Sequence, residues 1–261
     1  MTGGGLERTS TTHVTASSQT IEGLTFQTGG DISLFLDGVH DITVRNCFFK
    51  DCPGIYALNC TGNITIDHCT FDGLPMVNQP ARSHVIQFNQ CSGAGNKITN
   101  NVITMPLGGT VQDDAINLFK SNGTSGSPIL IDGNTLRGGG PSGSGSGILL
   151  GDNGGSYQTA SNNILVRPGQ VGIGVAGGEF IVVDTNRIAS DRQAWSNVGI
   201  YAINYTPAAP CDNITIQNNQ VDWTNAANVK NAYYTDGSAG TIGGVGTNVW
   251  NADLSVLLAT L

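Results

Sequence analysis

The chain has 261 residues, of which 39% are hydrophobic, 37 are glycine and only 11% are charged. This composition favours turns and hydrogen-bonded sheets and argues against a helical fold. The formal net charge of −8 argues against nucleic acid and anionic membranes as partners, because both bind clustered Lys and Arg. No apolar run reaches the roughly 18 residues that a membrane span needs, and the N-terminus lacks the apolar core of a secretory signal.

One phrase recurs along the chain: apolar and polar residues alternate, a bend follows, and an apolar residue closes the unit. It is seen in residues 41–51 and 63–73 and returns in 128–138, 180–190 and 213–223. A unit that recurs at intervals of a few tens of residues is typical of repeat architectures. Aligned on the bend, eight units are centred on Leu24, Cys47, Cys69, Asn101, Asn134, Asn163, Asn186 and Asn219.

Each unit also contains a second strand-like stretch, such as residues 53–60, 84–91 and 198–205. Two strands per unit, each paired with its counterpart one repeat later, predict a parallel β-helix of about eight rungs that spans residues 1–261 as one domain. Alternation places two aliphatic columns inside the helix. The first consists of Ile55, Ile86, Ile116, Ile148, Ile173 and Ile200, and the second of Val44, Ile66, Ile131, Val183 and Ile216.

The bend position is asparagine in the last five units. Inward amides at this position are expected to stack and to bond the backbone of the rungs above and below. The repeat resembles the right-handed parallel β-helix superfamily of pectate lyases and polygalacturonases over nearly the whole chain. The resemblance implies an all-β, single-stranded right-handed solenoid whose substrate groove is walled by long turns such as residues 137–147.

The two ends of the repeat carry separate expectations. Residues 240–261 are expected to leave the repeat as a C-terminal cap, with Trp250, Leu254 and Leu257 covering the last rung. The first rung begins near Val14 without a visible cap, and an open strand edge invites pairing. We therefore expect a homo-oligomer through the N-terminal end, or a further segment upstream. The expected location is secreted, extracellular or periplasmic, either with a signal removed or within a longer protein.

Six cysteines raise the choice between thiols and disulfides. Cys47 with Cys69, and Cys60 with Cys91, are expected on adjacent rungs, but stacked side chains that point the same way make a bridging torsion awkward. Free buried thiols are favoured over disulfides, and no C-x-x-C spacing indicates zinc.

The densest polar group falls on the second strands of three consecutive rungs: Arg82, His84, Gln87 and Asn89, then Asp113, Asp114, Asn117 and Lys120, then Asp152. Adjacent carboxylates repel, so the pair Asp113 and Asp114 suggests a metal, a shared proton or a catalytic acid. The alternative is a solvated turn. Strict alternation turns Asp114 inward, where it needs His84 or a cation as partner, unless it turns outward at the bend.

The stretch QDDAINL, followed one rung later by GSGILLG, resembles the polygalacturonase family and implies catalytic roles for Asp113 and Asp114. Three other family positions differ: a catalytic Asp falls on His84, a His falls on Ser146, and an Arg-Ile-Lys phrase falls on residues 172–174. Inverting hydrolysis needs two carboxyl groups about 6.5 to 9.5 Å apart, so the missing acid matters.

The stretch DDAINLFKS also resembles the chondroitinase and alginate lyase branch. That resemblance implies Ca²⁺ bound by Asp113 and Asp114, with Lys120 as the base, in β-elimination next to a uronate. The family's Arg falls on Gly151, so Arg137 or Tyr157 would supply the acid. A uronate lyase ranks slightly ahead of a glycoside hydrolase.

The alternative from another class is a non-catalytic glycan-binding or structural β-helix segment of a larger secreted protein. Outward tyrosines and amides suit sugar binding by stacking and hydrogen bonding. In either case the expected partner is a polysaccharide or oligosaccharide. The expected substrate-binding residues are Gln87, Asn89, Asn117, Asp152, Tyr56, Tyr201 and Arg137, beside the catalytic candidates Asp113, Asp114, Lys120, His84 and Arg82.

Overall fold

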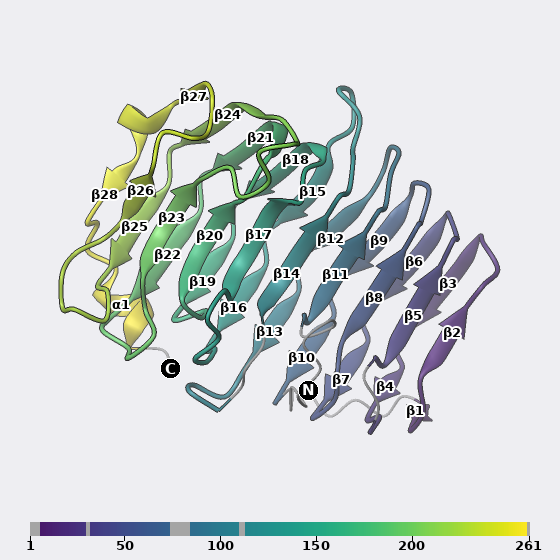
Figure 1. The fold of residues 1–261 in the computed structure, drawn as a ribbon. Helices are drawn as coiled ribbons and strands as arrows, with labels where there is room; N and C mark the ends of the chain where they lie inside the picture. The colour runs from purple at the N-terminus through teal and green to yellow at the C-terminus, as the bar shows by residue number, and fades with distance from the viewer. Residues whose placement is uncertain (1–5, 30–31, 74–83, 110–112, 260–261) are drawn as a thin grey trace.

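The structure is a computed structural model that describes residues 6–29, 32–73, 84–109 and 113–259. Its strands cycle through three all-parallel sheets and stack along a rod, with the first strands at one end and the last at the other (Figure 1). The fold is a parallel β-helix of the right-handed type with about nine rungs. The predicted fold class is therefore confirmed, with one rung more than expected.

The strands of each sheet follow chain order along the rod. Sheet A consists of β1 (Glu7–Arg8), β4 (Thr25–Phe26), β7 (Phe48–Lys50), β10 (Thr70–Asp72), β13 (Val102–Thr104), β16 (Thr135–Arg137), β19 (Ile164–Val166), β22 (Arg187–Ser190), β25 (Gln220–Trp223) and β28 (Val249–Trp250). Sheet B consists of β2 (Thr12–Val14), β5 (Leu34–Asp37), β8 (Ile55–Leu58), β11 (Ile86–Asn89), β14 (Asp114–Phe119), β17 (Ser146–Asp152), β20 (Val171–Val175), β23 (Val198–Ala202) and β26 (Tyr233–Thr235). Sheet C consists of β3 (Gln19–Glu22), β6 (Ile42–Arg45), β9 (Ile64–Asp67), β12 (Lys97–Thr99), β15 (Ile129–Asp132), β18 (Ser156–Ser161), β21 (Gly178–Asp184), β24 (Cys211–Gln217) and β27 (Ile242–Gly243).

Each rung has three strands, where two were predicted. The additional strand is the short one of sheet A, which follows the inner bend. In the third rung β9 ends at Asp67, His68 adopts a left-handed φ of 51°, and β10 begins at Thr70. A single left-handed residue turns the chain sharply enough to start a new sheet, so the recurring phrase spans two strands.

Both predicted aliphatic columns are confirmed. Ile86 pairs with Ile55 on one side and Ile116 on the other, and the same register continues through Ile148, Ile173 and Ile200. All members of the two columns are buried in one core cluster. The aliphatic columns therefore fix the register of the rungs.

The asparagine ladder is confirmed as well. The Asn134 backbone N–H donates to Oδ1 of Asn163 at 2.9 Å, and its Nδ2 donates to the Ile98 carbonyl at 2.9 Å. The same bonds recur along the ladder, and Cys69 occupies its slot as the N–H donor to Asn101. Each buried amide thus pairs backbone groups that the bend would leave without partners.

Part of the expected C-terminal cap belongs to the repeat instead. Within residues 240–261, β27 pairs with β24, β28 pairs with β25, and Asn248 extends the asparagine ladder beyond Asn219. Trp250 stacks on Tyr233 at 5.2 Å, at the end of the core. This segment therefore forms most of a ninth rung.

The last described residues run along the outside of sheet A. Leu254 and Leu257, at the start of and within the helix α1 (Ser255–Leu258), cluster with Val166 and Ala189 and do not cover the last rung as expected. A 3₁₀ turn, η1 (Val245–Thr247), lies before β28. No helix in the described part of the chain is long and apolar enough to cross a membrane.

The six cysteines are free and buried, as predicted.

At the N-terminal end of the rod, the strands β1, β2 and β3 are the outermost strands of the three sheets. Within the described residues each of them pairs on one side only. Association through this end stays a prediction.

Candidate functional site

The strands of sheet B begin with a slip in side-chain alternation. Ala115 and Ile116 are consecutive, yet both belong to the core cluster. One rung further on, a Cβ built on Gly147 would lie 2.7 Å from Cδ2 of Leu165 inside the helix. Because two neighbouring positions face inward, the preceding Asp114 turns to the outer face. The inward orientation predicted by strict alternation is wrong for Asp114, and the alternative of an outward turn holds.

The residues at this position form one row along the outside of sheet B. The register pairs Asp114 with Ser146, Ser146 with Val171, and Val171 with Val198. His84 contacts Asp114 from the preceding rung. The row therefore runs from two titratable side chains to two apolar ones.

Asp114 is almost fully buried, at 1% side-chain exposure. The Ser146 N–H donates to its Oδ1 at 2.9 Å, and Nδ2 of Asn117 donates to its Oδ2 at 2.8 Å. Burial raises the pKa of the Asp114 carboxyl well above its ordinary value, and the charge of Asp113 adds to that rise. The two N–H donors act in the opposite direction and do not cancel it.

His84 is held as a neutral ring beside this carboxyl. Its Nδ1 accepts the backbone N–H of Asp114 at 3.2 Å and lies 3.4 Å from Oδ2 of the same residue. Burial lowers the pKa of His84, although the charges of Asp113 and Asp152 oppose that change. The accepted bond assigns the ring proton to Nε2.

Asn117 connects the carboxyl groups of neighbouring rungs. It is fully buried, and its Oδ1 accepts a hydrogen bond from Nε2 of Gln87 at 2.9 Å. Its Nδ2 donates to Asp114 and also to Oδ2 of Asp152, the latter at 2.9 Å. The two N–H bonds of an amide diverge by about 120°, so the two carboxylate oxygens that they reach lie about 5 Å apart.

Asp113 meets the long turn that follows β16. Its Oδ1 accepts hydrogen bonds from the hydroxyls of Ser142, at 3.2 Å, and Ser144. One ligand atom each of His84, Asp113 and Asp114 lies within 4.8 Å of the others, so the three could hold a metal ion. We call His84, Asp113, Asp114, Asn117 and Asp152 the acidic cluster.

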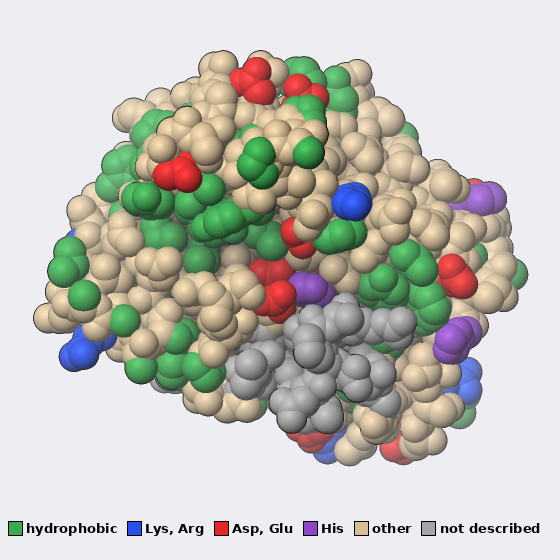
Figure 2. All heavy atoms as spheres, in the orientation of Figure 1, with side chains coloured by type: hydrophobic (Ala, Val, Ile, Leu, Met, Phe, Trp, Pro, Cys, Tyr) green, Lys and Arg blue, Asp and Glu red, His purple; other side chains and the backbone are tan. Residues whose placement is uncertain are grey.

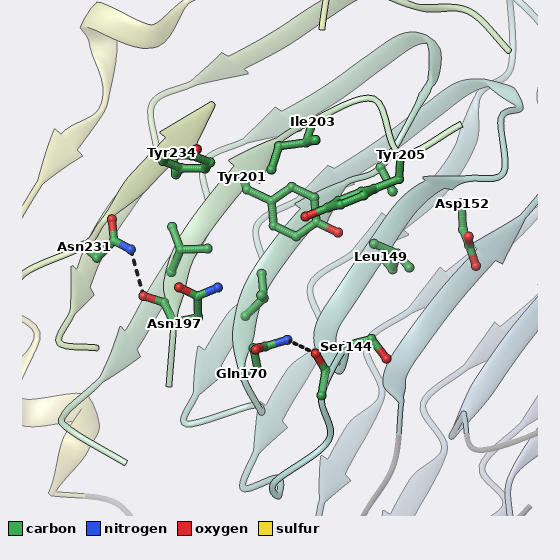
Figure 3. A pocket seen from close by; sticks show the side chains of 14 residues that line it. Ser144, Leu149, Asp152, Gln170, Asn197, Tyr201, Ile203, Tyr205, Asn231 and Tyr234 are labelled. Atoms are coloured by element: carbon green, nitrogen blue, oxygen red, sulfur yellow. Dashed lines mark hydrogen bonds between the residues drawn. The ribbon is translucent and has the colours of Figure 1, made fainter. Parts of the chain in front are cut away.

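A pocket of about 560 Å³ opens beside the acidic cluster on the next rungs (Figure 3). Asp152 belongs to both, and Ser144 reaches from the pocket rim to Asp113. Figure 2 shows acidic side chains next to a histidine near the middle of this face, with apolar side chains beside them. The pocket is lined by Gly143, Ser144, Leu149, Asp152, Gln170, Val171, Ala176, Asn197, Val198, Tyr201, Ile203, Tyr205, Asn231 and Tyr234.

Two of the other expected residues lie toward the far end of the strands. Lys120 follows β14, is exposed, and places its ammonium 5.3 Å from the Phe119 ring centre. Six residues of strand separate it from Asp114, about 20 Å along the sheet at 3.3 Å per residue. Asn89, at the end of β11, accepts a hydrogen bond from Gln90. Lys120 is thus distant from Asp114 along the strand, but its backbone N–H donates to the Asp152 carbonyl at 2.9 Å, so it adjoins the Asp152 end of the acidic cluster.

The remaining expected residues are spread over other places. Tyr56 lies on the outer face of sheet B with its ring 5.5 Å from that of Phe35. Arg137 ends β16 in sheet A, and Tyr157 stacks on Phe180 at 4.8 Å beside sheet C. Arg82 lies outside the described residues.

Several pocket residues were not among the expected ones. Tyr234 pairs with Tyr201 in register. Its position in the aligned strands, an even number of residues from other outward side chains, could have identified it as an outward residue. Val171 and Val198 have the parity of the inner isoleucines, so strict alternation would place them in the core. Their outward orientation follows from the same slip that turns Asp114.

The rungs and sheets are those of a parallel β-helix, and this fold hosts unrelated activities. Comparison of the chain with protein-family models, with curated proteins and with solved structures finds no match. An activity can therefore be inferred only from the geometry of the site.

Proposed function

We propose that this protein binds a polysaccharide along the outer face of sheet B and hydrolyses a glycosidic bond at the acidic cluster. The observation that carries the proposal is a buried carboxyl group of raised pKa, Asp114, that shares the Nδ2 of Asn117 with the carboxylate of Asp152. Ideal amide geometry places the two bonded oxygens about 5 Å apart. Glycosidases use such a pair, and a separation of about 5 to 5.5 Å is typical of retaining enzymes.

The two carboxyl groups differ in surroundings, as acid and nucleophile must. Asp114 is buried and keeps its proton to higher pH, so it is the general acid. Asp152 is half-buried, lines the pocket and is the second carboxylate. Asn117 holds both groups through one amide, and neutral His84 supports Asp114 from the preceding rung.

A row of outer side chains in sheet B supplies a surface for a glycan strand. Register aligns aromatic side chains at both ends of the row and amides in its centre. Aromatic faces stack on sugar rings, whereas the two central amides, Gln87 and Asn117, are buried and bonded to each other beneath this surface. The row consists of His13, Phe35, Tyr56, Gln87, Asn117, Leu149, Tyr201 and Tyr234.

Uronate elimination, ranked slightly ahead from the sequence, has less support. Its expected base, Lys120, is about 20 Å along the strand from Asp114. Its expected ion, Ca²⁺, takes six to eight oxygen ligands, whereas the candidate group offers one imidazole and two carboxylates. Both Asp114 oxygens already accept N–H bonds. Calcium therefore does not fit this set, and a metal that prefers imidazole would suit it better.

A second candidate is glycan binding without cleavage. The observation in its favour is the burial of Asp114, which has both oxygens occupied and little surface left for a substrate to touch. In that case the acidic cluster is a structural network, and Asp152 and the tyrosines bind sugar.

The experiment is an assay of purified protein against a panel of neutral and uronate polysaccharides, read for new reducing ends and for unsaturated-product absorbance. Each assay is run with calcium and with chelator. We expect reducing ends without unsaturated product, and a loss of at least about 100-fold in Asp114→Asn and Asp152→Asn. Asp132→Asn, on sheet C, is the matched control and should keep full activity. Unsaturated product would support elimination, and binding without cleavage would support the second candidate.

A further inference from the structure

The floor of the pocket is apolar although it lies on the outside of the solenoid. Leu149, Val171, Val198 and Ile203 belong to a hydrophobic cluster separate from the core, together with Ala176 and Tyr201. Val171 and Val198 reach the outer face because of the slip at the start of each strand. A sheet face turned to water normally carries polar side chains, so this apolar patch indicates a binding site for an apolar group of a ligand.

One glycine shapes the aromatic wall of the pocket. A Cβ on Gly174 would lie 2.6 Å from Cζ of Tyr201, so only glycine lets this ring lie across the neighbouring rung. Tyr205 meets Tyr201 edge to face, with ring centres 5.7 Å apart and planes at 88°. The two rings form a corner beside Leu149, into which a sugar ring can stack (Figure 3).

The charges around the pocket exclude an anionic sugar. None of the described lining residues is Lys or Arg, and the one charged side chain is Asp152. Two cations of the same rungs are engaged elsewhere: Arg167 pairs with Asp191, and Lys230 pairs with Asp222. A uronate carboxylate in this pocket would lose hydration, find no cation among the described lining residues, and be repelled by Asp152 and by the net charge of −8.

Uncharged amide groups gather at one rim of the pocket (Figure 3). Nδ2 of Asn231 donates to the Asn197 carbonyl at 2.9 Å, and Nε2 of Gln170 donates to the Gly143 carbonyl at 2.8 Å. These bonds hold the amides in place at the pocket edge, where they can meet hydroxyl or amide groups of a sugar. The pocket thus pairs an apolar floor and an aromatic wall with an uncharged polar rim.

We propose that this pocket is a subsite for an electrically neutral sugar that carries a methyl group, and that it positions this sugar beside the acidic cluster. The methyl group is that of an acetamido substituent or of a 6-deoxy sugar, and it lies on the floor formed by Val171, Val198 and Ile203. The inference rests on the proposed glycan function and names its substrate class.

The test is calorimetric binding of four sets of oligosaccharides: N-acetylhexosamine oligomers, 6-deoxyhexose oligomers, unsubstituted neutral hexose oligomers and uronate oligomers. We expect one of the methyl-bearing sets to bind about 10-fold or more tightly than the unsubstituted set, because one methyl group in an apolar pocket discriminates by that factor. Uronate oligomers should bind weakest. The two methyl-bearing arms distinguish the acetamido source from the deoxy source.

A conservative variant separates the subsite from the fold. Val198→Thr keeps the side-chain shape and should reduce several-fold the ratio of the affinity for the methyl-bearing sugar to the affinity for the unsubstituted set. Val182→Thr, on the outer face of sheet C, is the matched control and should change neither.

The outcomes also distinguish this inference from the proposed hydrolysis. Binding of methyl-bearing sugars without cleavage supports the subsite and contradicts hydrolysis. Binding or cleavage of uronate oligomers at equal or greater affinity overturns the subsite while a glycan function stands. Binding of no oligosaccharide overturns both.

Discussion

Asp114 and Asn117 lie on the same face of sheet B although they are three residues apart in one strand. Nδ2 of Asn117 donates to Oδ2 of Asp114 at 2.8 Å. In a regular strand, residues three apart point to opposite faces. The slip at Ala115 and Ile116, which both face the core, removes this difference and brings the carboxyl group to the amide.

Replacing Asn117 with alanine should destabilise the protein by about 1 to 3 kcal/mol, because it removes the hydrogen bonds of three partners. Those partners are Gln87, Asp114 and Asp152. Urea unfolding followed by circular dichroism measures the effect. Asn89→Ala is the control, because Asn89 bonds only its neighbour Gln90 among the hydrogen bonds found for its side chain, and it should cost less. An equal loss of unfolding free energy in the two variants would show that the hydrogen bonds of Asn117 do not stabilise the fold more than those of an exposed asparagine.

The asparagine ladder yields a second prediction. Asn134→Leu removes the acceptor for the Asn101 N–H and the donor to the Ile98 carbonyl, both fully buried. The cost of unpaired buried groups is again about 1 to 3 kcal/mol in the free energy of unfolding. Asn122→Leu, an exposed asparagine of the same rung, should have a small effect. A stable Asn134→Leu protein would mean that water or backbone shifts replace the ladder.

The repeat made the columns and the ladder predictable, because each aligned position has one side-chain type and one environment. The third sheet was not predictable in the same way. Its strands, such as β10 (Thr70–Asp72), have too few residues to show the alternation of apolar and polar side chains. They also follow the preceding strand after a bend of only two residues. The left-handed bend residue, which tertiary pairing fixes, decides where one strand ends and the next begins.

The orientation of Asp114 was open from sequence because a slip breaks the parity that alternation assumes. A signal was nevertheless present: the position before the inner isoleucine is small in successive rungs, as Ala115, Gly147 and Gly172. A small residue lets two adjacent positions face inward with little crowding, although Val85 beside Ile86 is a larger pair in the same place. The apolar pocket depends on the same slip, because strict alternation would place Val171 and Val198 in the core.

The buried cysteines give a third prediction. The adjacent thiols of Cys47 and Cys60, together with burial, raise the pKa values of Cys69 and Cys91, and burial raises the pKa of Cys211 to about 11. The same thiol contacts lower the pKa values of Cys47 and Cys60, but all six side chains are buried and closed to a reagent. The native protein should therefore react slowly with a thiol reagent at neutral pH, and all six cysteines should react in urea. Rapid labelling of several thiols in the native state would contradict the packing of the bends.

The acidic cluster gives a prediction on pH. The pKa of Asp114 is raised in the folded state, so between its ordinary value and the folded value the native protein holds a proton that the unfolded chain has lost. Stability then falls as pH rises through this window, with a slope of at most about 1.4 kcal/mol per pH unit. Asp114→Asn lacks this titration, whereas His84 is present in both proteins.

The measurement is urea unfolding of the wild type and of Asp114→Asn from pH 4 upward, with chelator present so that metal binding does not contribute. The stability of the variant relative to the wild type should increase with pH and then level off above the folded pKa. A relative stability that decreases with pH would mean that the N–H donors Ser146 and Asn117 hold Asp114 as a carboxylate, and an ionised Asp114 could not serve as the general acid.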